Sequence, residues 1–214
     1  MTICRRRLLG AVAMGAAGLA LPRVFGSDVA QAAPLDLAAS GIGRERFDSI
    51  LLPQARAALD RHGRMIANRD VIGLVDFSAP SGTARFSLFD IAADRVISTH
   101  LVAHGSGSDP ANSGWVERLS NRPGSNASCA GAFLTGPTYY GKHGRSRRLI
   151  GLDPNNDMAA SRAIVIHAAR YVDPGLAAAQ GRVGRSQGCF AVSAAEIDTV
   201  LKVLGPDRLL YAVK

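Results

Sequence analysis

Most apolar residues of this chain come in short extended runs separated by turns, and this pattern limits the fold more than any other feature. Val71–Val75 is a continuous apolar run, residues 85–88 alternate in polarity, and residues 95–103 form a third extended run. Because the connections between them are short, these runs predict an antiparallel sheet. Further extended runs occur at Leu149–Leu152, Ala163–Ile166 and Leu209–Val213. The pattern predicts a mainly β fold.

Helical periodicity is confined to a segment near each end. Apolar residues recur at helical spacing from Phe47 and predict a helix to about Ile66, with Pro53 either preceding its regular part or kinking it. Ser193 and Glu196 have the spacing of a capping box, which predicts a second helix that ends at Gly205-Pro206. Residues 105–144 are rich in glycine, serine and asparagine, and we expect a loop region there.

Residues 1–32 have the features of an export signal. Three arginines at 5–7 precede an apolar run over residues 8–21, and Ala30-Gln31-Ala32 fits a cleavage site. The run is shorter than the roughly 20 residues of a membrane-spanning helix, so no transmembrane anchor is expected. The Arg-Arg pair followed by apolar residues favours a twin-arginine signal over a general secretory one. We therefore expect an exported protein of the periplasm or cell envelope.

The rest of the chain divides into a linker at 33–46, a helical segment at 47–70 and a main domain at 71–214. The whole chain carries a net charge of +8, and loss of the signal removes four arginines and one aspartate. A modest positive charge suits an anionic polymer or a substrate with carboxylates. The arginines are scattered and form no basic run interleaved with aromatics, so nucleic acid is not an expected partner.

Cys129 and Cys189 are the two cysteines that remain after removal of the signal. In an oxidising compartment they would either form a disulfide or include one reactive thiol. If their Cα atoms lay within about 6 Å, oxidation of the pair could switch off a reactive Cys189. The chain has no Cys-x-x-Cys and no His-Glu-x-x-His, so no metal site is expected.

The setting of Cys189 favours reactivity. Ser186-Gln187-Gly188-Cys189 follows the glycine- and arginine-rich stretch 181–185, and the apolar strand 163–166 leads into His167. A cysteine with a histidine base is a nucleophile arrangement for acyl transfer. His143, in His143-Gly144, is the competing candidate for the base.

An ordered series of motifs from Val71 to the C-terminus resembles the murein L,D-transpeptidase catalytic domain. The series comprises Val102-Ala103-His104-Gly105-Ser106-Gly107, Ser120-Asn121 with Ser125, Tyr140-Gly141-Lys142-His143-Gly144, Gly151-Leu152, Ile164-Val165-Ile166-His167, Tyr171-Val172 and Gly181–Cys189. The resemblance implies a β-sandwich-like fold, no cofactor, and acyl transfer on the stem peptides of peptidoglycan by a monomer. The chain departs from the family at Ala168, where glycine is usual, and at Gln187, where an aromatic is common.

The resemblance also implies roles for individual residues. Cys189 would be the nucleophile, His167 the base, and the backbone N–H groups of Gly188 and Cys189 the oxyanion donors. Six residues would contact the substrate: Arg185, Arg182, Ser186, Tyr140, His143 and Asn121. Arg182 and Arg185 would hold its carboxylates, and Ser186 would also shape the loop.

The acylated cysteine would pass its acyl group to the amine of a second stem, which forms a cross-link. Two alternatives stay open: a carboxypeptidase that passes the acyl group to water, and a catalytically silent wall-binding domain. A papain-like peptidase fits poorly, because in that class the cysteine precedes the histidine along the chain.

Overall fold

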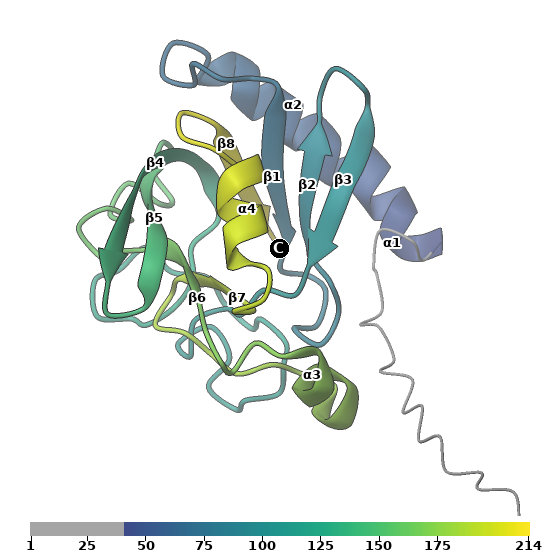
Figure 1. Ribbon diagram of the computed structural model, residues 1–214, viewed down its shortest axis with the longest axis vertical. Helices are drawn as coiled ribbons and strands as arrows, with labels where there is room; N and C mark the ends of the chain where they lie inside the picture. Colours follow the sequence, from purple (N-terminus) through teal and green to yellow (C-terminus); the bar gives the residue numbers. More distant parts are fainter. Residues whose placement is uncertain (1–40) are drawn as a thin grey trace, which may run out of the picture. The chain divides into compact units, whose positions relative to one another are not determined.

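A mixed sheet of eight strands organises residues 41–214, the part of the chain that the structure, a computed structural model, describes (Figure 1). The predicted signal and residues 33–40 lie outside the described residues. The strands run in the order β3-β2-β1-β8-β4-β5-β6-β7. Their bounds are β1 Val71–Asp76, β2 Phe86–Asp90, β3 Arg95–His100, β4 Gly131–Gly141, β5 Gly144–Gly151, β6 Val165–Ala168, β7 Phe190–Val192 and β8 Leu209–Val213. The mainly β prediction is confirmed.

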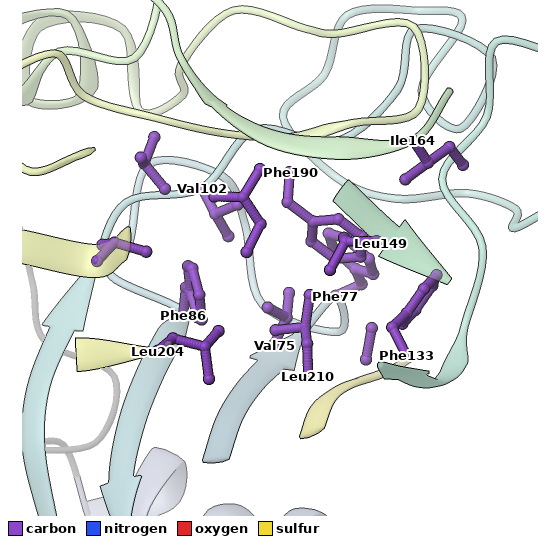
Figure 2. Close-up of a cluster of buried hydrophobic side chains, with 14 of the residues drawn as sticks. Val75, Phe77, Phe86, Val102, Phe133, Leu149, Ile164, Phe190, Leu204 and Leu210 are labelled. Atoms are coloured by element: carbon purple, nitrogen blue, oxygen red, sulfur yellow. The ribbon is translucent and has the colours of Figure 1, made fainter. Parts of the chain in front are cut away.

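Alternation along the strands divides the apolar side chains between two faces of the sheet. In β1, Ile72 and Leu74 belong to a core cluster formed with the N-terminal helices, whereas Val75 belongs to the main core. Strands from both halves of the sheet contribute to that main core, which includes Phe86 of β2, Phe133 of β4 and Phe190 of β7 (Figure 2). The two halves therefore face one core as in a sandwich, although the hydrogen-bonded order of strands is continuous.

The N-terminal helical segment begins earlier than its periodicity predicted. Helix α1 (Gly41–Arg46) takes up the end of the predicted linker, a π-helical turn η1 (Phe47–Leu51) follows, and α2 (Leu52–Arg61) completes the segment. Pro53 is the second residue of α2, just after the π-helical turn, so its missing N–H falls at the junction where the hydrogen-bond pattern changes from η1 to α2. Helix α2 runs beside strands β1–β3 in Figure 1 and buries Ala55, Ala58 and Leu59 against the sheet.

The second predicted helix is present as α4 (Ile197–Val203), but its cap differs from a capping box. Ser193 Oγ donates to Glu196 Oε2 at 2.8 Å, and Glu196 Oε1 lies 2.9 Å from His100 Nδ1. The two side chains thus bond to each other and to β3 instead of to the first N–H groups of the helix. An additional helix, α3 (Pro174–Gln180), follows the N-cap Asp173, whose side chain accepts from Leu176 N.

The prediction of a loop throughout 105–144 was wrong for residues 131–141. These residues form β4, the longest strand, which pairs with β5 and β8. The glycines and proline of β4 gave it the composition of a loop. Gly136-Pro137 falls at the irregularity where the β4–β5 register shifts. In the part of the chain that the structure describes, we find no helix with the length and apolarity needed to span a membrane.

Candidate active site

A pocket of about 700 Å³ lies between the end of β6, the segment before β7 and the tip of the β4–β5 hairpin. Cys189 and His167, 22 residues apart in the sequence, both line it. The parallel pairing of β6 with β7, in which His167 is opposite Ala191, brings the two segments together. The wall also contains Tyr139, Lys142, His143, Arg162, Ala163, Tyr171 and Arg185.

The loop that carries Cys189 depends on Gly188 and Ser186. Gly188 has φ +114°, and a Cβ at this position would lie 2.7 Å from the Ala127 carbonyl oxygen and 3.1 Å from Arg162 Nη2. Only glycine fits this conformation and this space. Ser186 Oγ accepts from Gly188 N at 3.1 Å and donates to the Cys189 carbonyl at 2.7 Å. The hydroxyl therefore closes the tight turn that presents the cysteine.

A buried row of three side chains lies behind this loop. Arg85 Nη2 donates to His104 Nδ1 at 2.7 Å, and His104 Nε2 lies 3.2 Å from Asp109 Oδ2. Because a guanidinium only donates, the imidazole is neutral and its Nε2–H donates to the carboxylate. Burial, with the charge of Arg85, lowers the pKa of His104 to about 4. The His104 carbonyl accepts from Ser186 N at 2.8 Å, so the row supports the cysteine loop directly.

His167 has one ring nitrogen engaged. Its Nδ1 lies 2.8 Å from the Ala168 carbonyl oxygen, which only accepts, so Nδ1 carries the proton and Nε2 has the free lone pair. Burial is the main cause that lowers the pKa of His167, and the neighbouring His143 and Lys142 lower it further. The imidazole is therefore neutral near pH 7 and able to accept a proton at Nε2.

The Cys189 thiol is partly exposed in the pocket. It donates to the Ala163 carbonyl at 3.6 Å, and Ala163 has the unusual backbone φ of +53°. Burial raises the pKa of Cys189, while the charges of Lys142 and Arg162 oppose that rise. The pocket thus contains a neutral thiol and a neutral imidazole, and the thiol hydrogen is directed at the Ala163 carbonyl.

The family model for the L,D-transpeptidase catalytic domain matches residues 44–213. The chain belongs to the L,D-transpeptidase catalytic domain family. This match includes the helical segment as well as the sheet. A search of curated proteins finds no match.

Solved L,D-transpeptidases are similar to this domain at low identity. The enzyme from Mycobacterium smegmatis is 12% identical, with a TM-score of 0.43 over 68% of this chain and 59% of that one. L,D-transpeptidase 1 of Mycobacterium tuberculosis is 12% identical, with a TM-score of 0.39 over 67% of this chain and 62% of that one. The L,D-transpeptidase of Xylanimonas cellulosilytica is 16% identical, with a TM-score of 0.39 over 75% of this chain and 70% of that one. The chain spans about three fifths of the length of the two mycobacterial structures.

Three of the six residues predicted to contact substrate line the pocket of this L,D-transpeptidase domain: Ser186, Arg185 and His143. Arg185 Nη1 is already engaged, since it donates to the backbone carbonyls of Asp109 and Pro110. The Nη1 end of the Arg185 guanidinium is thus fixed to the loop after His104.

The other three predicted contacts lie outside the pocket wall. Tyr140 is 83% exposed, because it follows Tyr139 on β4 and its side chain points to the opposite face of the hairpin. Asn121 bonds through its amide to Pro154 O, Asp157 Oδ1 and Met158 N, and so ties two loops together. Arg182 packs against Gly114.

Tyr139, Lys142 and Arg162 line the pocket although the sequence did not predict them as site residues. The strand alternation of β4 would have indicated Tyr139 if residues 131–141 had been recognised as a strand. Arg162 donates to the carbonyls of Ser120 and Ala127 and to Ser125 Oγ, and so holds the loop at 120–127 beside the pocket. No sequence signal identified these long-range bonds.

Cys129 and Cys189 are both free thiols in the structure. Cys129 is 1% exposed, and burial raises its pKa to about 11, which makes it a core residue of low reactivity. Among residues 41–214, no group of three or more His, Cys, Asp or Glu side chains is arranged to hold a metal ion.

Proposed function

We propose that this chain is an exported cysteine L,D-transpeptidase that cleaves the bond between diaminopimelate and D-alanine in peptidoglycan tetrapeptide stems and forms cross-links. The observation that carries the proposal is the pairing, in one pocket, of the Cys189 thiol with a neutral His167 whose Nε2 is free. Membership of the L,D-transpeptidase catalytic domain family supports the reaction class. We further propose that residues 1–32 are the export signal and that residues 71–214, with the helices packed on them, form the catalytic domain.

The first half-reaction begins when the Cys189 thiol gives its proton to His167 Nε2. The thiolate attacks the carbonyl carbon of diaminopimelate, and the C–N bond to D-alanine breaks as the imidazolium returns the proton to the leaving amine. The bond from Nδ1–H to the Ala168 carbonyl stabilises the transient imidazolium. Because both resting groups are neutral, this proton transfer is what makes the thiolate.

The tetrahedral intermediate needs donors for its oxyanion. We assign this role to the N–H groups of Gly188 and Cys189, and removal of such a donor typically costs about 2.7–4 kcal/mol in the barrier. In the resting state the Gly188 N–H is bonded to Ser186 Oγ. The charged oxyanion would compete for that N–H, since a hydrogen bond to an anion is roughly twice as strong as one between neutral groups.

Positive charge around the pocket suits a substrate that carries carboxylates. Lys142, Arg162 and Arg185 reach the wall from three separate parts of the chain: the hairpin tip, the segment before β6 and the segment before β7. We assign the recognition of stem carboxylates to Lys142 and Arg185. Arg162 has a different role, since its guanidinium is bonded to loop carbonyls.

The test is mass spectrometry of the purified chain incubated with a disaccharide-tetrapeptide that contains diaminopimelate. For the wild type we expect release of D-alanine together with a cross-linked dimer, and for Cys189→Ala neither product. Formation of a tripeptide alone would identify water as the acceptor and the chain as a carboxypeptidase. Absence of any cysteine-dependent product would refute the enzymatic proposal and favour the wall-binding alternative.

A further inference from the structure

The turn between β4 and β5 carries a second histidine onto the candidate base. Lys142 and His143 form the tip of the hairpin between the paired residues Gly141 and Gly144. The His143 ring stacks on the His167 ring with centroids 4.2 Å apart and planes inclined by 23°. His143 is exposed on its other side, whereas His167 is buried.

The Tyr139 side chain packs against the turn and fixes its position. A Cβ at Gly141 would lie 2.8 Å from Tyr139 Cε2, which means that the Tyr139 ring packs directly under the turn backbone. The Arg148 guanidinium lies over the same ring at 4.5 Å from its centroid. The turn that carries His143 is therefore held in place by the packed side chains of Tyr139 and Arg148.

The His167 side chain is held by packing, since it is buried, and by one hydrogen bond. Its ring makes one hydrogen bond, from Nδ1 to the Ala168 carbonyl, and this bond fixes one edge but allows the ring plane to tilt about it. A stacked ring fixes the plane. A base must be held within a fraction of an ångström to accept a proton efficiently, so the second restraint matters to the chemistry.

We propose that His143 is a positioning residue for His167: stacked from the β4–β5 turn, it holds the imidazole with Nε2 open to the Cys189 side of the pocket. This inference rests on the proposed function, in which His167 is the base. In this role His143 acts on the chemistry through His167, and its ring shape matters more than its ring nitrogens.

The charged groups near His167 affect its pKa, and this effect can be measured separately from the effect of ring stacking. Lys142 and His143 on the hairpin both lower the pKa of His167, while on the other segments Cys189 is the facing titratable group, with Arg162 and Tyr171 beside it. Removal of the His143 imidazole removes one of these effects and raises the pKa of His167. Removal of the stack, by contrast, affects the rate at any pH.

The experiment compares His143→Phe, which keeps a stacked ring, with His143→Ala, which does not. Arg145→Ala is the matched control, because it removes an exposed cation from the same hairpin outside the pocket wall. Three readouts are taken on the full chain: the rate of Cys189 alkylation by iodoacetamide against pH, the NMR shifts of the His167 ring, and turnover of the disaccharide-tetrapeptide.

For His143→Ala we expect the plateau alkylation rate and turnover to fall about two- to tenfold, the range of an aromatic pair, with a changed ring shift of His167. For His143→Phe the plateau should stay within about twofold of the wild type, while the acid limb moves to higher pH in both variants. Equal losses in the two variants would overturn the inference, because the imidazole would then act chemically. Unchanged rates in both would also overturn it.

Alkylation and NMR do not require peptidoglycan, so the two proposals fail in different ways. If the disaccharide-tetrapeptide is not turned over but alkylation follows the expected pattern, the proposed substrate is refuted and the role of His143 is not. Cysteine-dependent turnover together with unchanged rates in both His143 variants would refute only the positioning role of His143. Thermal unfolding of each variant identifies any loss that comes from misfolding.

Discussion

Substitution of Gly188 by alanine tests whether the loop backbone sets the reactivity of Cys189. Gly188 has φ +114°, and an added Cβ would lie 2.7 Å from the Ala127 carbonyl oxygen, about 0.7 Å inside the 3.4 Å of ordinary contact. The strained backbone costs about 1–3 kcal/mol, or roughly 2–12 °C in Tm for a domain of this size. Relief of the clash must displace the residue before the nucleophile, and a misplacement near 1 Å costs about 100-fold in rate.

Gly181→Ala is the matched control, because Gly181 has φ +68° and nothing within 4 Å of an added Cβ. It should show a loss of stability from strain without the loss of rate. Turnover and Cys189 alkylation would be measured beside thermal unfolding for both variants. Wild-type alkylation and turnover in Gly188→Ala would refute the reasoning, since the Ala127 carbonyl would then not constrain the loop.

Two further predictions concern stability. The pKa of His104 is lowered from 6.5 to about 4, so the unfolded chain takes up a proton first as the pH falls, and the free energy of unfolding should decrease between pH 6.5 and 4 by at most about 3 kcal/mol. Urea denaturation across this window should show this dependence on pH, and His104→Gln should remove most of it. An unchanged pH dependence in His104→Gln would contradict the assignment. Phe190 is fully buried, with ring centroids 5.8 Å from Phe77 and 5.4 Å from Phe133, so Phe190→Ala should cost about 3–5 kcal/mol and Phe190→Leu under about 1.5 kcal/mol. Thermal or urea unfolding measures both, and equal losses would contradict the packing argument.

Several elements of the fold follow from local pattern. The run Leu209–Val213 predicts β8 at its observed bounds, and Val71–Val75 predicts all but the last residue of β1. Both runs are apolar, β-branched or aromatic in part, and bounded by turn residues, so the local signal is strong. Strand β4 gave no such signal, because its glycines and Pro137 have the composition of a loop while its pairing with β5 and β8 provides the stability.

For the candidate site, the sequence was enough to single out Cys189 and His167, because their chemistry and their local settings can be recognised along the chain. It also indicated that Ser186 would shape the loop, in accord with the bonds of its hydroxyl to Gly188 N and the Cys189 carbonyl. Only the tertiary structure decided which other residues surround them. Tyr139 and not Tyr140 lines the pocket because of strand alternation, and Asn121 is bonded to a distant loop.

The same division holds for the buried groups. The sequence contains Arg85, His104 and Asp109 but gives no reason to join them. The His104–Asp109 bond lies within one loop, whereas Arg85, 19 residues before His104, meets it only in the folded sheet. The stack of His143 on His167 likewise depends on the β4–β5 hairpin. Residue type and local backbone fix which groups are able to react, whereas pairing over long sequence separations fixes which groups stand beside them, and so sets their pKa values and orientations.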